Sequence, residues 1–265
     1  MRWIACLTLV LICLSACRAP DARPVEPVEA LGARTGHGFL YENAEGERVY
    51  ALLAGIRGGE NDASRLALQS LLNEAGDALS LVETEAGPDR YDRPIVLAMF
   101  NRGAQTVYLD AEMVKAGRAM VWPRPEAAMR SALLYELEAE ARAADRGGWG
   151  EGGFVIRPPY PDPLAQYLDS AQIIEGRVVA VGEARNGRLY LNFGSNWRTD
   201  FTVSLNRQDR ERFEQQGLYD PATLDGAHIR VRGWLYDENG PMIHVASPAQ
   251  IEIIDAPEPV SLPWP

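Results

Sequence analysis

The stretch GFLYENAEGERVYALLAGIRGGEND, residues 38–62, decides the fold of the first half of the chain. Two apolar runs flank turn residues at 44–46, and this pattern predicts a β-hairpin over residues 38–56. The second run ends at Arg57 and two glycines, and the acidic residue Glu60 follows. A strand that ends in glycines and charged groups is a candidate for the rim of an active site.

The elements after this stretch predict an α+β fold for the first half of the chain. In chain order we expect a helix capped by Asp62 and ended by Gly76, strands at 79–85, 94–100 and 106–109, a short helix capped by Asp110, and a longer helix from Pro125 to Gly147. Strands that precede and separate helices in this order favour a small β-barrel with attached helices.

The second half of the chain predicts a second small barrel. Five strand-like runs lie at 173–184, 187–193, 200–205, 227–236 and 240–247, with a polar helix near 209–216. A helix between the third and fourth of five strands is typical of an OB-like barrel.

Prolines and composition set the expected domain boundaries. The run RPPYPDP at 157–163 predicts a stiff linker, and both chain ends are rich in proline. We therefore expect a signal segment at 1–17, a tether at 18–33, a first domain at 34–156, a linker at 157–164, an OB-like domain at 165–256 and a tail at 257–265.

The composition is that of an ordinary globular protein with an acidic balance. The formal net charge is −11, with 46% hydrophobic and 24% charged residues. Neither half of the chain is net basic, which argues against tight DNA binding driven by overall charge. A local basic patch is compatible with this composition.

The N-terminus predicts attachment to a membrane. Arg2 precedes an apolar run at 3–14, which is too short to span a bilayer, and the sequence LSAC follows at 14–17. This pattern resembles the signal of bacterial lipoproteins, which implies a lipid on Cys17 and a location in the cell envelope. The residue after Cys17 is Arg18 rather than aspartate, and in this resemblance that implies a periplasm-facing or outer-membrane lipoprotein. All three cysteines lie in this segment, so no disulfide is expected in the rest of the chain.

Four motifs, in order, resemble the staphylococcal nuclease (thermonuclease) family over residues 36–150. They are LAGI at 53–56 with Glu60 four residues later, DRYDR at 89–93 followed by PIVLAMF, VKAGRAMVW at 114–122 and AEARAADRGGWG at 139–150. The resemblance implies an OB-like five-stranded barrel with helices. It also implies calcium-dependent hydrolysis of phosphodiesters, and an OB-like module of the kind found beside such domains.

The resemblance transfers only part of the family's catalytic site. Glu60 corresponds to the family's carboxylate and Arg93 to one of its two arginines, while Leu52 stands where the other arginine is expected. Arg57 stands in place of a calcium-binding aspartate, and no acid occurs near His37, where a second one is expected. At about 4 Å and an effective dielectric near 20, two like unit charges repel by roughly 4 kcal/mol. We therefore expect no metal site and no cofactor, with calcium required only if the domain is an active nuclease.

Each of these residues also has a plain structural interpretation. Arg57 pairs with Glu60 or acts as a displaced phosphate clamp; Glu60 alternatively favours the start of a helix through its dipole. Arg93 alternatively holds Asp89 or Asp92 across a turn. The three histidines, His37, His228 and His244, show no metal-site spacing and are expected to be structural.

Strand alternation in AHIRVRGWLY predicts a second candidate surface, for nucleic acid. One face of this strand would carry Arg230, Arg232, Trp234 and Tyr236 together with His228, and Tyr190 and Trp197 would lie nearby. OB folds bind single strands with such arginines and rings. Alternatively, the rings cover apolar surface against the first domain, with the arginines solvated.

The sequence thus favours a thermonuclease-like envelope lipoprotein, catalytically degenerate, that binds nucleic acid or protein. The alternative is an active nuclease that hydrolyses DNA or RNA outside the cytoplasm, with Glu60 and Arg93 as its catalytic residues. A structural envelope protein with a protein partner is a third hypothesis.

Overall fold

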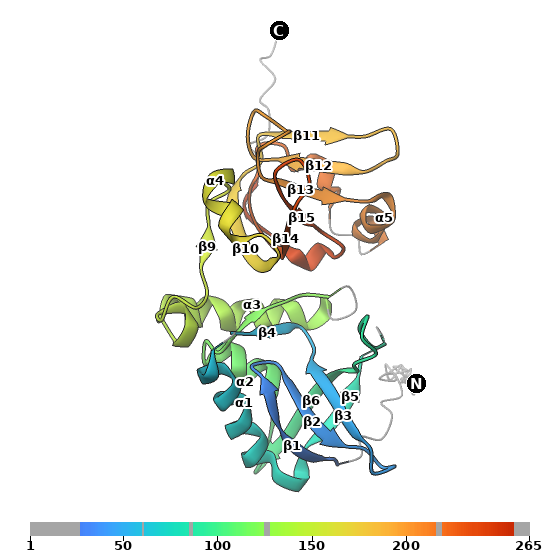
Figure 1. Ribbon diagram of the computed structural model, residues 1–265, viewed down its shortest axis with the longest axis vertical. Coiled ribbons are helices and arrows are strands. Elements are labelled where there is room, and N and C mark those ends of the chain that lie inside the picture. Colours follow the sequence, from blue (N-terminus) through green and yellow to red (C-terminus); the bar gives the residue numbers. More distant parts are fainter. Residues whose placement is uncertain (1–26, 60, 85–86, 125–127, 216–218, 257–265) are drawn as a thin grey trace, which may run out of the picture.

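A computed structural model describes residues 27–256 except 60, 85–86, 125–127 and 216–218. The expected signal segment with Cys17, most of the expected tether, Glu60 and the tail lie outside the described residues. Two lobes are stacked along the long axis (Figure 1), and we call residues 27–154 the N-terminal lobe and residues 156–256 the C-terminal lobe. Each lobe has its own sheet and its own apolar core.

A six-stranded sheet forms the frame of the N-terminal lobe. Its strands are β1 (Glu29–Thr35), β2 (Gly38–Glu42), β3 (Arg48–Leu53), β5 (Ser80–Glu83), β6 (Ile95–Arg102) and β7 (Gln105–Tyr108). The order is β1-β2-β3-β6-β5, with β7 also on β6; β3 and β6 run parallel. The amide of Val28 donates to the Leu79 carbonyl at 2.8 Å, so the sheet curls until its first and last segments meet.

Helices and a small second sheet cover this curled sheet. The helices are α1 (Asp62–Ala75), α2 (Leu109–Lys115) and α3 (Ala128–Ala143), with 3-10 turns at Gly76–Ala78 and Gly147–Trp149. Short strands β4 (Ile56–Gly58) and β8 (Ala119–Val121) pair antiparallel. Leu68 and Leu72 of α1 are buried against the sheet because they repeat at helical spacing. Asn61 rather than Asp62 caps α1, through a 3.1 Å bond from the Ser64 amide.

The C-terminal lobe is built on an eight-stranded sheet. Its strands are β9 (Ile156–Arg157), β10 (Ser170–Arg177), β11 (Ala180–Glu183), β12 (Leu189–Asn192), β13 (Thr202–Leu205), β14 (His228–Asp237), β15 (Pro241–His244) and β16 (Ile251–Asp255). The order is β11-β12-β13-β15-β14-β10-β9, with β16 on β14, and β13 runs parallel to β15. Helix α5 (Arg207–Gln215) lies between β13 and β14 in the chain.

The lobes are joined by ordered segments. Within the expected proline linker, Arg157 belongs to β9, which pairs with β10 of the C-terminal sheet, and Pro161–Leu164 forms α4, followed by a 3-10 turn at Ala165–Tyr167. Helix α3 packs against the 3-10 turn Pro248–Gln250 of the other lobe. There the Tyr135 hydroxyl donates to the Ala249 carbonyl at 2.5 Å.

Most expected elements are present, with several exceptions. The hairpin at 38–56 and its turn are confirmed, as are the runs at 187–193, 200–205, 227–236 and 240–247. The run at 173–184, expected as one strand, is divided between β10 and β11. Strand β1 begins inside the expected tether, and the short strands β4, β8, β9 and β16 were not expected. Asp110 lies within α2 and is buried beside Arg130, so it does not cap the helix. The strands β4, β8 and β9 have two or three residues each, which is too few alternations to be recognised in a sequence.

Candidate functional site

Two loops meet at the end of the N-terminal lobe that faces the C-terminal lobe. The turn between β1 and β2 carries Gly36 and His37, and it lies against β4, which carries Arg57 and Gly58. A Cβ atom on Gly58 would come within 2.2–2.4 Å of the Gly36 backbone, so only glycine permits this approach. The loops enclose a cavity of about 360 Å³. Its described lining is Arg34, Thr35, Gly36, His37, Arg57, Gly58, Gly59, Asn61, Asp62 and Arg65.

His37 lies in a buried position close to several arginines. Its Nδ1 atom is buried and has no hydrogen-bond partner among the described residues. Burial, followed by the nearby guanidinium groups of Arg57, Arg93 and Arg124, lowers the pKa of His37 to about 4. Because like charges oppose protonation, the imidazole is neutral at neutral pH and the surroundings favour an anion.

Arg93 is held by an ion pair with Asp89. Its Nε donates to Asp89 Oδ2 at 2.8 Å, and Asp89 Oδ1 accepts from the Tyr91 and Arg93 amides. The bond from Arg93 lowers the pKa of the Asp89 carboxyl to about 2 despite its burial. The contact across the turn expected as an alternative for Arg93 is therefore present. It fixes the guanidinium beside Tyr50, whose ring centre is 5.7 Å away.

Arg57 links the two lobes through aromatic rings. Its guanidinium carbon lies 5.8 Å from the Trp122 ring centre and 5.7 Å from the Trp234 ring centre. Trp122 follows β8 in the N-terminal lobe, whereas Trp234 is on β14 of the C-terminal lobe. The expected pairing with Glu60 lies outside the described residues. Arg57 thus lines the cavity beside His37 and also contacts the neighbouring lobe.

The residues of this cavity do not fit a calcium ion. Calcium needs several oxygen ligands with negative charge, whereas Arg57 stands where the nuclease resemblance expects one carboxylate and no acid occurs near His37, where it expects another. Asp62, which is acidic and lines the cavity, pairs with Arg65 at 3.1 Å. Across the part of the chain that the structure describes, no group of three or more His, Cys, Asp or Glu side chains is placed to hold a metal. Leu52 is buried in β3, so no second arginine is supplied from that position.

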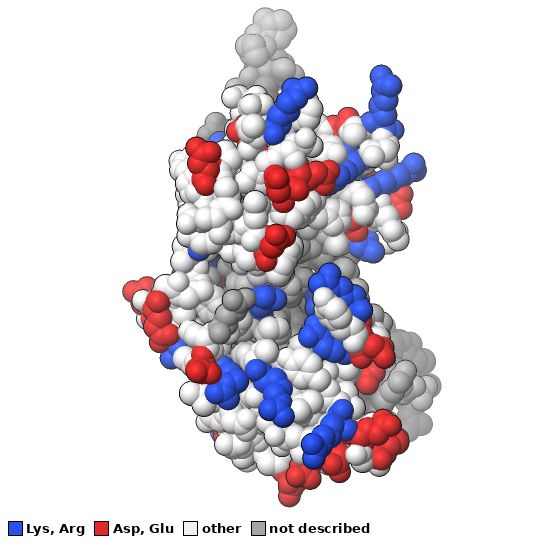
Figure 2. All heavy atoms as spheres, viewed as in Figure 1, with Lys and Arg blue, Asp and Glu red and all other residues white. Residues whose placement is uncertain are grey.

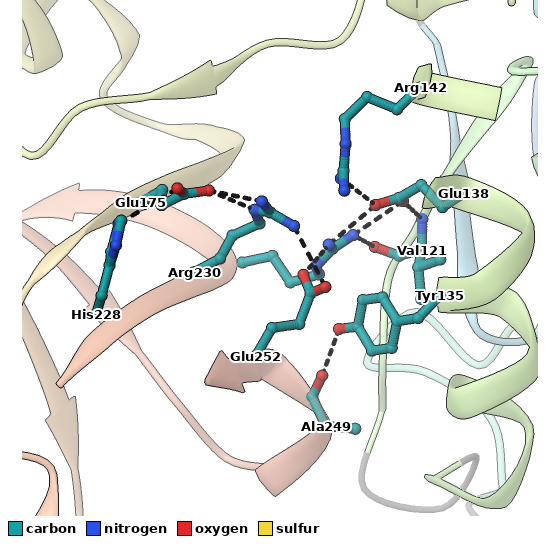
Figure 3. Close-up of polar contacts among 10 residues, drawn as sticks. Val121, Tyr135, Glu138, Arg142, Glu175, His228, Arg230, Ala249 and Glu252 are labelled. Atoms are coloured by element: carbon teal, nitrogen blue, oxygen red, sulfur yellow. Dashed lines mark hydrogen bonds and ion pairs between the residues drawn. The ribbon is translucent and has the colours of Figure 1, made fainter. Parts of the chain in front are cut away.

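Arg232 is not the exposed nucleic-acid contact that strand alternation suggested. Its side chain is 0% exposed, and from β14 it reaches Glu138 on α3 of the other lobe, which Figure 3 labels. Both Nη atoms bond Glu138 at 3.0 Å, and Nη1 also donates to the Val121 carbonyl at 3.0 Å. Glu252 binds the same guanidinium. The prediction for Arg232 is wrong because the face lies against the other lobe and the arginine is neutralised there.

Arg230 is likewise occupied. Its Nε donates to Glu175 at 2.8 Å, and it also pairs with Glu252 at 3.4 Å (Figure 3). His228, on the same face, lies 3.3 Å from Glu175. The alternation along β14 was thus read correctly, but the arginines of this face are buried rather than solvated. Neither expected environment, an open binding surface or solvated arginines at an edge, describes them.

Three of the candidate rings of the C-terminal lobe, those of Trp234, Tyr236 and Tyr190, do not form one surface. Trp234 is 46% exposed and faces Arg57. Tyr236 and Tyr190 instead gather around Arg188, which donates to the Tyr236 hydroxyl at 3.3 Å and lies 5.1 Å from the Tyr190 ring centre. Arg188 is itself paired with Glu238. Trp234 is therefore the one candidate of this group that contacts the cavity region.

A Ser–His–Asp chain in the C-terminal lobe is structural. Ser204 Oγ lies 3.3 Å from His244 Nδ1, and His244 Nε2 lies 2.9 Å from Asp209 Oδ2. A nucleophilic serine needs access to a substrate. Ser204 is 0% exposed, and Asp209 is also paired with Arg212. These hydrogen bonds connect β13, β15 and α5.

Basic side chains gather on one part of the surface. In Figure 2, Lys and Arg side chains cluster on the N-terminal lobe next to the narrow waist, whereas acidic and basic groups mix on the C-terminal lobe. Sequence reasoning missed Trp122, Tyr50 and Arg124 in this region and took His37 as structural. The signal was available in part, since Trp122 closes the motif VKAGRAMVW.

No protein-family model matches the chain, and no curated protein matches it significantly. Within the described residues, no helix combines the length and apolar character needed to cross a bilayer.

Proposed function

We propose that this protein is a thermonuclease-like envelope lipoprotein that binds nucleic acid at its N-terminal lobe and has lost the hydrolytic activity of that family. The proposal depends on the cavity beside His37 and on the arginines around that histidine. Three guanidinium groups act on the neutral His37, and one of them, Arg57, contacts two tryptophans. Guanidinium groups with aromatic rings suit a phosphate joined to a base.

The strand order supports a thermonuclease-like barrel. In an OB-like barrel the third strand runs parallel to the last, and β3 runs parallel to β6 here. Contact between the segment before β1 and the segment before β5 brings the sheet close to closure. The helix α1 follows the glycine loop, as the family motif expects.

The C-terminal lobe supports an OB-like assignment more fully. Strand β10 pairs with β14, and β11, which follows it, pairs with β12. The order then continues through β13 and β15 to β14, which pairs with β10. With β10 and β11 counted as one bent strand, this order has the five strand positions that an OB-like barrel requires, which supports the assignment. Helix α5 lies between the third and fourth of them, as in OB barrels.

Binding without cleavage follows from the charges in the cavity. In the family, calcium brings charge stabilisation and helps to activate water. A cavity lined by Arg57 and a neutral His37 attracts phosphate but repels a divalent cation. We therefore propose that Arg57 and Arg93 position phosphate groups. The lipid expected on Cys17 would hold this module at the periplasmic face of the envelope.

Cleavage and binding assays test the proposal with the chain from 18 to 265, which contains every described residue. We expect no cleavage of DNA or RNA in Ca²⁺, Mg²⁺ or EDTA. We expect fluorescence anisotropy to show salt-sensitive binding of an oligonucleotide. Arg93→Gln should weaken binding and reduce the slope against log salt by about 1. Arg207→Gln, on the exposed surface of the C-terminal lobe, is the matched control and should change neither.

Two results would contradict the proposal in different ways. Calcium-dependent cleavage that Glu60→Gln abolishes would establish the alternative, an active nuclease. Absence of both cleavage and binding would instead favour a module for a protein partner. Arg232→Ala would be a poor test of binding, because it removes a buried ion pair.

A further inference from the structure

Trp234 is unusual among the residues on its face of β14. The neighbours at alternate positions, Arg230 and Arg232, are buried in ion pairs with acidic residues. Trp234 follows them on the same face but is 46% exposed. The indole therefore exposes apolar surface to water directly beside two covered arginines, which is unfavourable unless a ligand or partner contacts it.

The side of Trp234 that is covered contacts the phosphate-binding region. Its ring centre lies 5.7 Å from the guanidinium carbon of Arg57, which lines the cavity beside His37. Arg57 also stands 5.8 Å from the ring of Trp122. A guanidinium stacks with its faces and hydrogen-bonds through its edge, so contact with rings is compatible with contact to a phosphate.

The cavity at His37 shares part of its lining with a cleft between the lobes. Arg57, Gly58, Gly59 and Asn61 line both the cavity at His37 and a larger cleft of about 600 Å³. That cleft is bordered by Ala171 of β10, which is the residue directly opposite Trp234 in the sheet register. The binding region is therefore not confined to one lobe.

Resting on the proposed function, we infer that Trp234 forms a stacking subsite for an unpaired nucleobase, supplied by the C-terminal lobe to a phosphate site in the N-terminal lobe. A phosphate at Arg57 lies within one nucleotide of the indole. Bases stack on aromatic rings irrespective of sequence, but only when they are unpaired. The ligand is accordingly single-stranded nucleic acid, and a base-free polyphosphate would use the arginines alone.

A competing explanation is that Trp234 only joins the lobes through Arg57. The two explanations differ in what the removal of the indole affects. A structural role lowers stability and weakens every ligand equally, whereas a stacking role affects only ligands with bases. Trp197 offers a matched control, because it is 54% exposed, belongs to the same lobe and lies 4.1 Å from Arg198.

The test compares oligothymidine, a duplex of the same length and inorganic tripolyphosphate as ligands of the chain from 18 to 265. Trp234→Ala should weaken oligothymidine binding roughly 5- to 150-fold, the loss expected for one stacked base. It should leave tripolyphosphate competition within about 2-fold. Trp234→Phe should retain most of the affinity, and Trp197→Ala should change neither ligand. The unmodified protein should prefer the strand to the duplex.

The outcomes separate this inference from the proposed function. If oligothymidine binds the Trp234→Ala protein as tightly as the unmodified protein, the stacking subsite is refuted and the proposed function stands. Equal loss for oligothymidine and tripolyphosphate, with a lower unfolding midpoint in both Trp234 variants, shows that the indole is structural and also overturns the inference. If neither ligand binds the unmodified protein, both proposals fail. A loss confined to Trp197→Ala would move the base contact to the other surface of the lobe and refute the role of Trp234.

Discussion

Replacement of Arg232 by methionine tests whether a buried ion pair fixes the two lobes against each other. Methionine keeps much of the aliphatic volume but removes the charge. It leaves Glu138, which is 1% exposed, without the guanidinium that binds both of its oxygens (Figure 3). It also leaves the Val121 carbonyl without the donor that Arg232 provides. Arg142 is 3.8 Å from Glu138, too far for a hydrogen bond to replace the lost ones.

The expected cost follows from the burial of the partner that remains. Removal of one member of a buried ion pair costs about 3–5 kcal/mol, because an uncompensated charge stays in a medium of low dielectric. In the double variant Arg232→Met/Glu138→Gln that charge is absent. Glutamine keeps an oxygen for the Val121 amide, which donates to Glu138 at 2.6 Å. Glu252 keeps Arg230 as its partner. The double variant should therefore lie within about 1–2 kcal/mol of the unmodified protein.

Urea unfolding followed by circular dichroism and by tryptophan fluorescence measures these differences. The matched control is Arg177→Met, which removes an exposed pair with Asp255 in the same sheet and should cost at most about 1 kcal/mol. In Arg232→Met the unfolding curves from the two probes should no longer coincide, because the lobes unfold less cooperatively once the ion pair between them is lost. A loss below about 1 kcal/mol for Arg232→Met would refute the reasoning. So would a double variant less stable than the single one.

Three further predictions concern the cavity and its surroundings. Burial and Arg57 hold the pKa of His37 at about 4 in the folded protein, whereas the unfolded chain protonates this residue near pH 6.5. The free energy of unfolding should therefore fall by about 3 kcal/mol between pH 6.5 and pH 4. In urea unfolding curves at several pH values, His37→Gln should remove this pH dependence. Since the pKa of Asp89 is about 2, its contribution is complete above its unfolded value near 3.8 and is lost as the pH falls towards 2; at pH 7, Asp89→Asn should cost roughly 1–3 kcal/mol in urea unfolding. Gly58→Ala should lower both the unfolding midpoint and oligonucleotide affinity because its Cβ would overlap the Gly36 backbone, and an unchanged midpoint would refute the close approach of the loops.

Local patterns in the sequence predicted the elements of the fold well where the patterns were long. The hairpin at 38–56 and the strand of β14 have clear alternation over many residues, and both are present. Helix α1 ends at Gly76 as expected, because glycine adopts the positive φ of 50° found there. The short strands and the ordered linker were missed because their partners lie far along the chain, as Ile156 pairs with Ile173.

The environment of each face was harder to predict than the face itself. Arg232 and Val231 lie on opposite faces of β14, as predicted. The burial of Arg232, however, depends on Glu138, which is 94 residues away in the chain. Arginine on a strand is usually exposed, so the sequence alone favoured a solvated surface. The contact between Arg57 and Trp234 was missed for the same reason, since it forms only when two lobes are placed side by side.

Local charge, rather than net charge, decides what the cavity at His37 attracts. The protein carries a formal charge of −11, which on its own would repel a polyanion. However, fields from exposed charges are screened over about 8 Å at physiological salt, whereas partly buried groups are screened much less. Many acidic side chains elsewhere are neutralised by partners, as Glu138 and Glu252 are by Arg232. At this point Arg57, Arg93 and Arg124 add, after burial itself, to the lowering of the His37 pKa, so positive charge is concentrated beside the imidazole. Under the proposed function, we therefore expect slow long-range association with a polyanion and binding only near these arginines, which favours a strand end or an unpaired segment over a long duplex.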